Sequence, residues 1–213
     1  MELTRSIEIC KKNGARLLED AEYLYDFDRY ASAYGLAKLA QEEFAKGFIL
    51  KLVESGALKW NGEVRRSLNH HVSKQLMVVI LDFLNPNTHE FLELIKNDSL
   101  FKRPKKVSDA MNIYVHEVLR RWESKNWLWA EEPEYDKETK SIWNGKEDRM
   151  KQDAFYVNIS NEGEAIDATS KFKKNVVKEE IEKADRYGRF INGGNDDSRY
   201  KEIVEILKLM GRA

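Results

Sequence analysis

The chain contains very few helix breakers for its length, and this feature constrains its fold more than any other. Only three prolines, at positions 86, 104 and 133, occur in 213 residues. Between them, lysine, glutamate, leucine and alanine fill long segments in which apolar residues recur at helical spacing. Such a sequence is typical of an all-α protein.

Apolar periodicity predicts helices along most of the chain. They lie at about residues 3–25, 30–54, 61–84, 88–96, 108–122, 169–190 and 198–210. A short break at DFDRY, residues 26–30, separates the first two helices, which should form an antiparallel hairpin, and Gly56 should end the second. Pro86 should end the third, and Thr88 and Ser108 are the expected N-caps of the next two.

The second half of the chain is less regular. The acidic stretch from Ala130 to Ser141, which contains a proline, predicts a surface loop. The sequence near residues 154–158 predicts at most one short β piece. The expected architecture is a helical bundle over residues 1–130, with a mostly helical C-terminal extension over 131–213 packed on it.

Composition limits the functional classes. Lysine plus arginine (36) nearly equals aspartate plus glutamate (37), so a nucleic-acid surface would have to be a local patch. The single cysteine, Cys10, excludes an internal disulfide and a cysteine-built zinc site. No apolar run approaches the roughly 18 residues of a membrane span, and the N-terminus does not resemble a signal peptide. We therefore expect a cytoplasmic protein without a membrane partner.

Several catalytic motifs are absent from the sequence. A di-metal carboxylate site in a helical bundle needs Glu-x-x-His on two helices. The residues three positions before the four histidines are Ser67, Leu68, Pro86 and Ile113. Glycine-rich phosphate loops, G-x-S-x-G and H-E-x-x-H are also missing. Neither a metal site nor a cofactor is expected.

The stretch EVRRSLNHHVSKQL, residues 63–76, concentrates cationic side chains on the third expected helix. Arginine can hold two phosphate oxygens and histidine exchanges protons near neutral pH, so the two together suit metal-free RNA cleavage. Residues five positions apart on one helix are rotated by about 140°, and a two-fold dimer would be needed to gather them around one groove. Arginine, histidine and lysine side chains beside an apolar stripe more often simply form a solvent-exposed helix face. The side chains concerned are Arg65, Arg66, His70, His71 and Lys74.

Two further groups of charged residues could assist. On the second helix, Glu43 interrupts an otherwise apolar line that continues to Lys46, and its carboxylate should need a partner. A basic connector follows the fourth helix and could contact an RNA backbone, although such runs are usually solvated loops. It consists of Lys102, Arg103, Lys105 and Lys106.

Three places between residues 14 and 160 share a pattern with a known family. In the first, a tyrosine-rich turn and small residues lead to a segment like Glu-Glu-x-x-x-Lys. In the second, a later helix carries His-x-x-Lys, and in the third a basic helix runs into FYVN. In these places the chain resembles the AbiV-type abortive infection proteins of the HEPN superfamily. The matching residues are Glu42, Glu43, Lys46, His71, Lys74, Arg149 and Lys151.

The resemblance implies a homodimeric HEPN bundle that acts in antiviral defence. Many HEPN proteins are metal-independent endoribonucleases that use Arg-x4–6-His. Arg65 with His70 or His71, and Arg66 with His71, meet this spacing. Either histidine would be the acid or base, and either arginine would hold the phosphate. Supporting roles would fall to Glu42, Glu43, Lys46 and Lys74.

Two departures from the family pattern leave an alternative open. In the family's usual ribonuclease motif, a polar residue directly follows the arginine; here that residue is Arg66 or Ser67, which fits only loosely. The motif also lies on an earlier helix than is usual. The protein could instead be a non-catalytic helical module that binds a phage protein or a nucleotide and blocks translation or phage development. Its contact surface would include Trp122, Trp127 and Trp129.

Overall fold

The structure is a computed structural model that describes residues 3–96, 102–120, 134–167, 169–193 and 198–212. Helices make up most of these residues, and the strands that it describes form one small hairpin. The prediction of an all-α fold with a short β piece is therefore confirmed.

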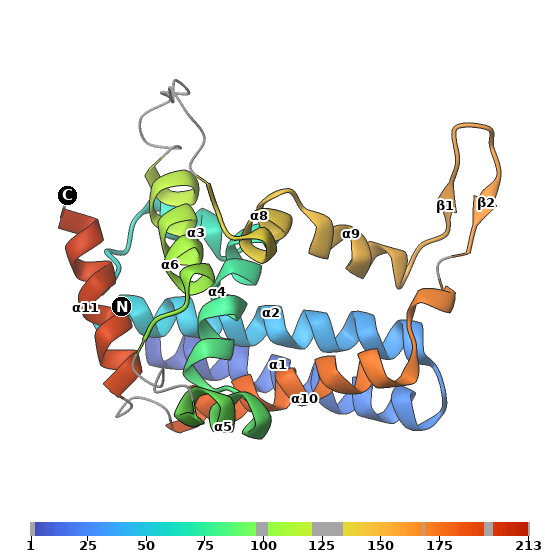
Figure 1. Ribbon diagram of the computed structural model, residues 1–213, viewed down its shortest axis with the longest axis horizontal. Coiled ribbons are helices and arrows are strands. Elements are labelled where there is room, and N and C mark those ends of the chain that lie inside the picture. The colour runs from blue at the N-terminus through green and yellow to red at the C-terminus, as the bar shows by residue number, and fades with distance from the viewer. Residues whose placement is uncertain (1–2, 97–101, 121–133, 168, 194–197, 213) are drawn as a thin grey trace.

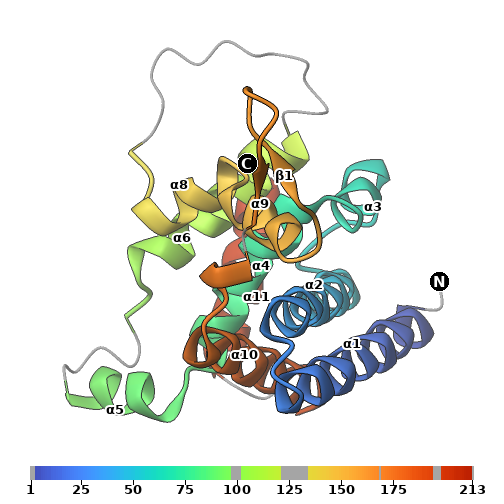
Figure 2. The same cartoon turned by 90° about the vertical axis from the view of Figure 1, so that its right-hand side faces the viewer.

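Three long helices form the base of the molecule. They are α1 (Leu3–Asp26), α2 (Tyr30–Glu54) and α10 (Lys174–Gly193), and they lie side by side (Figure 1 and Figure 2). A tight turn joins α1 to α2 as an antiparallel pair, with Asp28 in the left-handed region at a φ of 56°. Gly56 has a φ of 73° just beyond α2, which confirms it as the stop of this helix.

The remaining elements pack across or beside this base (Figure 1). Strands β1 (Asn158–Ile159) and β2 (Ala165–Ile166) are antiparallel, with Asn158 opposite Ile166, and their hairpin projects from one end. The other helices are α3 (Gly62–Ser67), α4 (His71–Leu84), α5 (Thr88–Lys96), α6 (Lys105–Asn112), the π-helix η1 (Ile113–Arg120), α8 (Lys137–Trp143), α9 (Lys146–Asp153), the 3-10 turn η2 (Thr169–Lys171) and α11 (Ser198–Arg212).

The central helix α2 is buried on nearly every side. It packs against α1, α10, α4 and α9, and this is why polar residues on it lie in the interior. Gln41 is 1% exposed, Glu42 3% and Lys51 9%. The Lys51 ammonium donates to the Ile191 carbonyl of α10 at 2.7 Å. The buried surface of α2 is therefore wider than a single apolar stripe and includes polar residues.

Phe44 holds the three base helices together. Its buried ring lies against Gly14 of α1 and Gly188 of α10. A Cβ atom on Gly14 would be 2.6 Å from Phe44 Cε1, and one on Gly188 would be 2.9 Å from Phe44 Cζ. Both glycines are therefore needed for the close approach of their helices to α2.

We expect Gly14→Ala to lower the free energy of unfolding by about 1–3 kcal/mol, because the added methyl group must displace a packed ring. Urea denaturation would measure the change. Gly211→Ala in α11 is the matched control, since nothing lies within 4 Å of its Cβ position, and it should be neutral or slightly stabilising. Equal stability of the two variants would contradict the tight packing at Phe44.

The prediction of one helix over residues 61–84 is wrong. α3 ends at Ser67, and His70 has an extended backbone (φ −93°, ψ 122°) as the N-cap of α4. The Ser67 hydroxyl donates to the Val64 carbonyl at 2.8 Å and lies 3.0 Å from the Tyr114 hydroxyl. Serine and asparagine compete with the helical backbone in this way. The apolar periodicity continues through the break and hides it.

Several predicted boundaries also need correction. Asn87, not Thr88, caps α5, because its side chain accepts from Glu90 N at 2.9 Å and Glu90 accepts in return from Asn87 N at 3.1 Å. Ser108 lies within α6, which begins after Pro104, and η1 replaces the α-helix expected after Asn112. Residues 137–141 belong to α8 rather than to a loop. The three tryptophans at 122, 127 and 129 lie outside the described residues.

Both predicted parts of the chain contribute to the main core. Phe190 of α10 and Tyr200 of α11 pack around Phe48 of α2, with ring centroids 6.2–6.3 Å apart. The extension is thus in direct contact with the bundle. The boundary at residue 130 stays a prediction.

Candidate functional site

Glu42 on α2 is the centre of the candidate site. Its carboxylate side chain is 4% exposed. One oxygen, Oε2, lies 2.7 Å from both Lys74 Nζ and His71 Nδ1 of α4, and the other, Oε1, accepts from Lys151 Nζ of α9 at 2.6 Å. Side chains from three helices that are distant in sequence therefore meet at one buried carboxylate.

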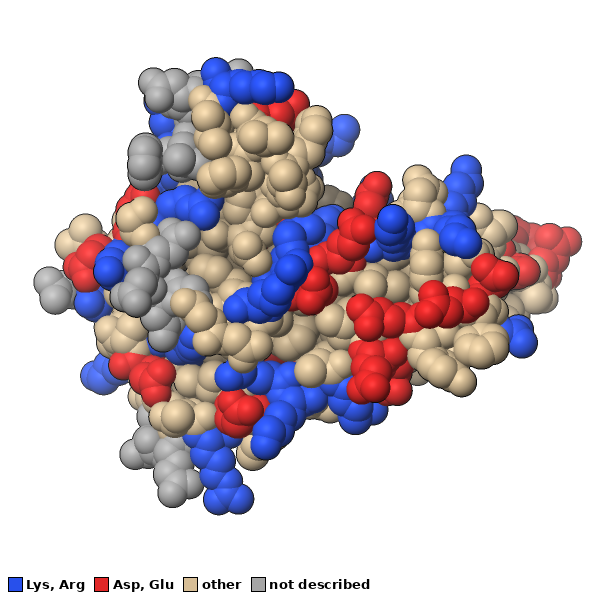
Figure 3. Space-filling view, turned by 90° about the horizontal axis from the view of Figure 1, so that it is seen from below, with Lys and Arg blue, Asp and Glu red and all other residues tan. Residues whose placement is uncertain are grey.

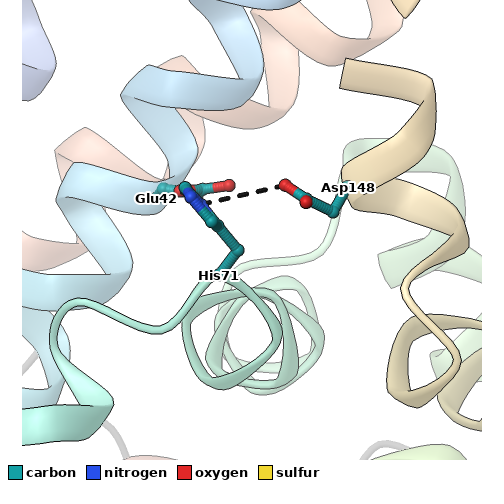
Figure 4. A group of neighbouring side chains, drawn as sticks. All are labelled: Glu42, His71 and Asp148. Atoms are coloured by element: carbon teal, nitrogen blue, oxygen red, sulfur yellow. Dashed lines mark hydrogen bonds and ion pairs between the residues drawn. The ribbon is translucent and has the colours of Figure 1, made fainter. Parts of the chain in front are cut away.

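The helix break before α4 gives His71 its position. Because α4 begins at His71, the imidazole and Lys74 lie on the same face, one turn apart, and both reach α2. On α9, Asp148 and Lys151 are also three positions apart and point toward the same place. Figure 4 shows the side chains of Glu42, His71 and Asp148 converging on one place, with His71 facing Asp148 at 3.9 Å.

The charges in this group balance. Lys74 and Lys151 are each 7% exposed at the side chain, and they face Glu42 and the less buried Asp148. Burial raises the pKa of Glu42, but the charges and hydrogen bonds of Lys74 and Lys151 lower it by more, so the pKa lies below its usual value. Glu42 is therefore an ionised group at neutral pH, as both lysines require.

The contacts of His71 determine its neutral tautomer. Nδ1 faces a carboxylate oxygen at 2.7 Å, which can only accept, and an ammonium at 2.9 Å, which can only donate. Lys151 already donates to Glu42 and forms an ion pair with Asp148, whereas an unprotonated Nδ1 would oppose its lone pair to that of Glu42. We therefore assign the proton to Nδ1. The Nε2 lone pair is then available, on a side chain that is 46% exposed.

Glu42, His71 and Asp148 also offer metal-ligand atoms within 4.8 Å of one another. However, Lys151 Nζ lies 2.6 Å from Glu42 Oε1, 2.9 Å from His71 Nδ1 and 2.9 Å from Asp148 Oδ1. Its ammonium thus takes the place that a cation would have among these three groups. A metal ion would have to displace Lys151, so the donor set fits a metal poorly.

A second buried ion-pair group lies nearby, centred on Glu180 of α10. Glu180 Oε2 accepts from Lys38 at 3.2 Å and from Gln41 at 2.8 Å, and its Oε1 accepts from Lys183 at 3.2 Å. Burial raises the pKa of Glu180, but the charges of Lys38 and Lys183 lower it further, to about 2. This group ties α10 to the polar side of α2.

The low pKa of Glu180 predicts a loss of stability in acid. The stabilisation is complete above the ordinary pKa of 4.5 and disappears as the pH falls to about 2, because the unfolded chain takes up the proton first. The free energy of unfolding should fall by about 3 kcal/mol over this range. Urea titrations at several pH values would measure this change, and Glu180→Gln should give a flatter profile. Identical profiles for the two proteins would contradict the assignment.

The arginines and His70 lie apart from this group. Arg66 forms an ion pair with Glu63 on its own helix, and these two residues line a small hollow with His70. His70 Nδ1 is 3.4 Å from Ser73 Oγ, and burial, then the charges of His71 and Lys74, lower its pKa. Arg65 is exposed. Within the described part of the chain, neither arginine is a bonded partner of His71.

Adjacent glutamates on α2 have different environments. Glu43, which the sequence singles out as the interrupting carboxylate, pairs with Lys46 at 2.5 Å on its own helix and is not the residue that contacts His71. A rotation of about 100° per residue separates Glu42 from Glu43, and only Glu42 faces α4. Among the described residues, no direct contact with His71 therefore supports the orienting role expected for Glu43 and Lys46.

Most of the basic connector is already paired with acids. Arg103 contacts Glu202 at 3.0 Å, Lys105 contacts Asp109 at 2.7 Å and Lys106 contacts Glu138 at 3.2 Å. Lys102 is exposed and has no such partner among the described residues. A role of the connector in RNA binding stays a prediction.

Sequence reasoning left Asp148 and Lys151 out of the site. Lys151 matched the family pattern, but nothing in its local sequence connects it with Glu42, 109 positions away. Asp148 carries no sequence signal apart from its spacing to Lys151. Only the packing of α9 against α2 and α4 brings these residues in.

The face drawn in Figure 3 is not a continuous basic surface. Acidic side chains form a band across it, over the helices α1 and α10. Burial, then the negative charges of Asp185, Asp26 and Glu19, raise the pKa of Glu22. A polyanion is repelled by such a band, so this part of the surface does not favour nucleic-acid binding.

An all-α bundle of this kind is the class of fold to which HEPN proteins belong. The family model described as AbiV matches residues 2–189, a range that includes every residue of this site. The chain therefore belongs to the AbiV family of HEPN proteins, and the resemblance seen in its sequence is confirmed. This family places it with the abortive infection proteins of phage defence.

Comparison with curated proteins gave no match, and comparison with solved structures gave none either. None of the helices in the described ranges is both long enough and apolar enough to span a bilayer.

Proposed function

We propose that the protein acts in phage defence as a homodimeric, metal-independent endoribonuclease of the cytoplasm, with His71 as its proton-transfer residue. The observation that carries this proposal is the pair of Glu42 and His71. A buried carboxylate fixes the proton on Nδ1 at 2.7 Å and leaves Nε2 as a base on an accessible side chain. Carboxylate–imidazole pairs serve this purpose in other hydrolytic sites.

The chemistry requires one base, one acid and a cation. His71 Nε2 would take the proton of a ribose 2′-hydroxyl, and the 2′-oxygen would form a bond to phosphorus. The bond from phosphorus to the 5′-oxygen would break, and a second imidazole would protonate this oxygen. The products are a 2′,3′-cyclic phosphate and a 5′-hydroxyl.

The lysines of the site would act as positioning residues. Lys74 and Lys151 are too buried to contact a polymer, but they keep Glu42 ionised and fixed in place. Glu42 in turn orients the imidazole of His71. Their contribution to cleavage would therefore pass through His71 rather than through contact with RNA.

A second copy of the chain would complete the site. In one copy, Arg65 is exposed and forms no ion pair with described residues, and Arg66 and His70 face a different hollow from His71. A two-fold axis near the start of α4 would place an arginine and a second histidine of one copy beside His71 of the other. Guanidinium groups would then stabilise the charge on the phosphorane.

The proposal is tested by incubating the purified protein with RNA in buffer that contains EDTA. We expect fragments that end in 2′,3′-cyclic phosphate, identified by mass spectrometry. Sedimentation at the same protein concentration should show a dimer. RNA that remains intact, with or without added divalent metal, would contradict cleavage by this protein.

One observation favours a second candidate function, that of a non-catalytic module that binds a phage protein. The projecting hairpin and the segment before it expose large apolar side chains: Tyr156 is 69% exposed, Val157 66% and Ile159 64%. Exposed apolar groups of this size are typical of a protein-binding surface. If the wild-type protein protects cells from phage but leaves RNA intact in EDTA, this function replaces cleavage.

A further inference from the structure

A polar cavity adjoins Glu42. It has a volume of about 140 Å³ and lies between α2, α4, α8, α9 and α10. Neither His71 nor the two lysines of the candidate site line it. Val78, Val79 and Ile142 provide apolar walls, while the other walls are polar. The cavity thus shares one wall residue, Glu42, with the candidate site, and its other walls come from residues outside that site.

Gln75 of α4 lines this cavity, and its buried amide oxygen is unpaired among the described residues. The side chain is 95% buried, since 5% of its surface is exposed, and Oε1 has no hydrogen-bond partner among the described residues. A buried amide without partners costs about 1–3 kcal/mol, so native proteins nearly always supply one. Whichever way the amide is turned, it offers one acceptor and one donor in the same plane.

The charged groups around the cavity already neutralise one another. Lys183 pairs with Glu180, and Lys38 pairs with both Glu180 and Glu147. Glu138 pairs with Lys106, and Asp82 accepts from Arg186 at 2.8 Å and from Tyr187 at 3.1 Å. A charged ligand would add a charge that no described group is left to balance. The open hydrogen-bonding capacity is that of the neutral Gln75 amide.

The volume of the cavity limits the size of a ligand. A cavity of about 150 Å³ in another protein accommodates benzene. A space of about 140 Å³ therefore limits the buried part of a ligand to about one ring, and its apolar walls suit the faces of a flat molecule.

We propose that this cavity binds a small, flat, uncharged molecule that carries a hydrogen-bond donor beside an acceptor on one edge, as a primary amide or a lactam does. Gln75 recognises this edge with its own amide, and Val78, Val79 and Ile142 contact the ring. This proposal does not depend on RNA cleavage. Because Gln75 follows Lys74 on α4, the bound molecule would lie next to the helix that carries His71.

Benzamide and benzoate distinguish this proposal from its alternatives. They have nearly the same shape, but benzoate carries a charge and offers only acceptors. In ligand-detected NMR with the full-length protein, benzamide should bind and raise the melting temperature, whereas benzoate should bind at least about tenfold more weakly. In the wild-type protein, the side-chain amide signals of Gln75 should shift as benzamide is added.

Two variants locate the binding. Gln75→Met removes both amide groups at similar volume and should weaken benzamide binding by at least about tenfold. Gln152→Met makes the same change on the exposed surface of α9 and should leave benzamide binding unaltered. The proposal is overturned if benzamide fails to bind, if benzoate binds equally well, or if the Gln75 signals do not shift. The cavity would then hold only water.

Discussion

Replacing His71 by alanine should lower the rate of RNA cleavage by about 10²–10⁴-fold, the usual contribution of a residue that transfers a proton in the reaction. The physical reason is the loss of the imidazole that Glu42 holds with Nε2 available. The rate is measured from the appearance of cyclic-phosphate ends under single-turnover conditions. Because the His71 side chain is 46% exposed, its removal should change the free energy of unfolding little.

Two other histidine variants make this result specific. His89→Ala on α5 removes a side chain that is 83% exposed and lies 3.9 Å from Glu93, so cleavage should be unchanged. His70→Ala tests whether the neighbouring imidazole supplies the acid. If His71→Ala cleaves as fast as the His89→Ala control, the role assigned to His71 is wrong.

Replacing Glu42 by glutamine should lower the free energy of unfolding by about 3–5 kcal/mol, because removing one member of a buried ion pair leaves the other charge without compensation. Here two ammonium groups, on Lys74 and Lys151, would lose the same carboxylate. Burial raises the pKa of Glu42, but these lysines lower it by more, so the carboxylate is stabilising at neutral pH. Urea denaturation at pH 7 measures the loss.

The adjacent residue provides the control. Glu43→Gln makes the same chemical change, but the ion pair of Glu43 with Lys46 is partly exposed, with side chains 17% and 24% exposed. Its loss should cost under about 1 kcal/mol. Adding Lys151→Met to Glu42→Gln removes one unbalanced charge and should recover part of the stability. Similar values for Glu42→Gln and Glu43→Gln would show that Glu42 is less buried than the structure indicates.

These two glutamates show where sequence reasoning succeeds and where it stops. The periodicity of α2 identified a carboxylate on a helix that should be buried, and the family resemblance matched Glu42, Glu43, His71 and Lys74 together. Consecutive side chains on a helix point about 100° apart, so which glutamate faces α4 depends on where α4 packs. The sequence of α2 alone does not show where α4 packs. The contact between Glu42 and His71 shows that Glu42 is the glutamate that faces α4.

The helix break before His71 was hidden for a related reason. The apolar residues on either side, Val64 and Val72, keep a helical spacing through it, so periodicity alone predicts one continuous helix. The buried contact of Ser67 with Tyr114, 47 positions later, accompanies the break. Without this break, His71 would not begin α4, from which its side chain reaches Glu42.

The sequence by itself determined the helical class of this protein, the two opening helices, the stop at Gly56 and the family to which the chain belongs. These features depend on backbone preferences and on spacing within a few turns, which are local. The tertiary structure alone decided which carboxylate meets His71, that Lys151 takes the place of a cation beside it, and that Gln75 faces a cavity. Each of these depends on side chains of separate helices meeting in a low-dielectric interior, where an unpaired polar group is costly and the choice of partner is set by packing.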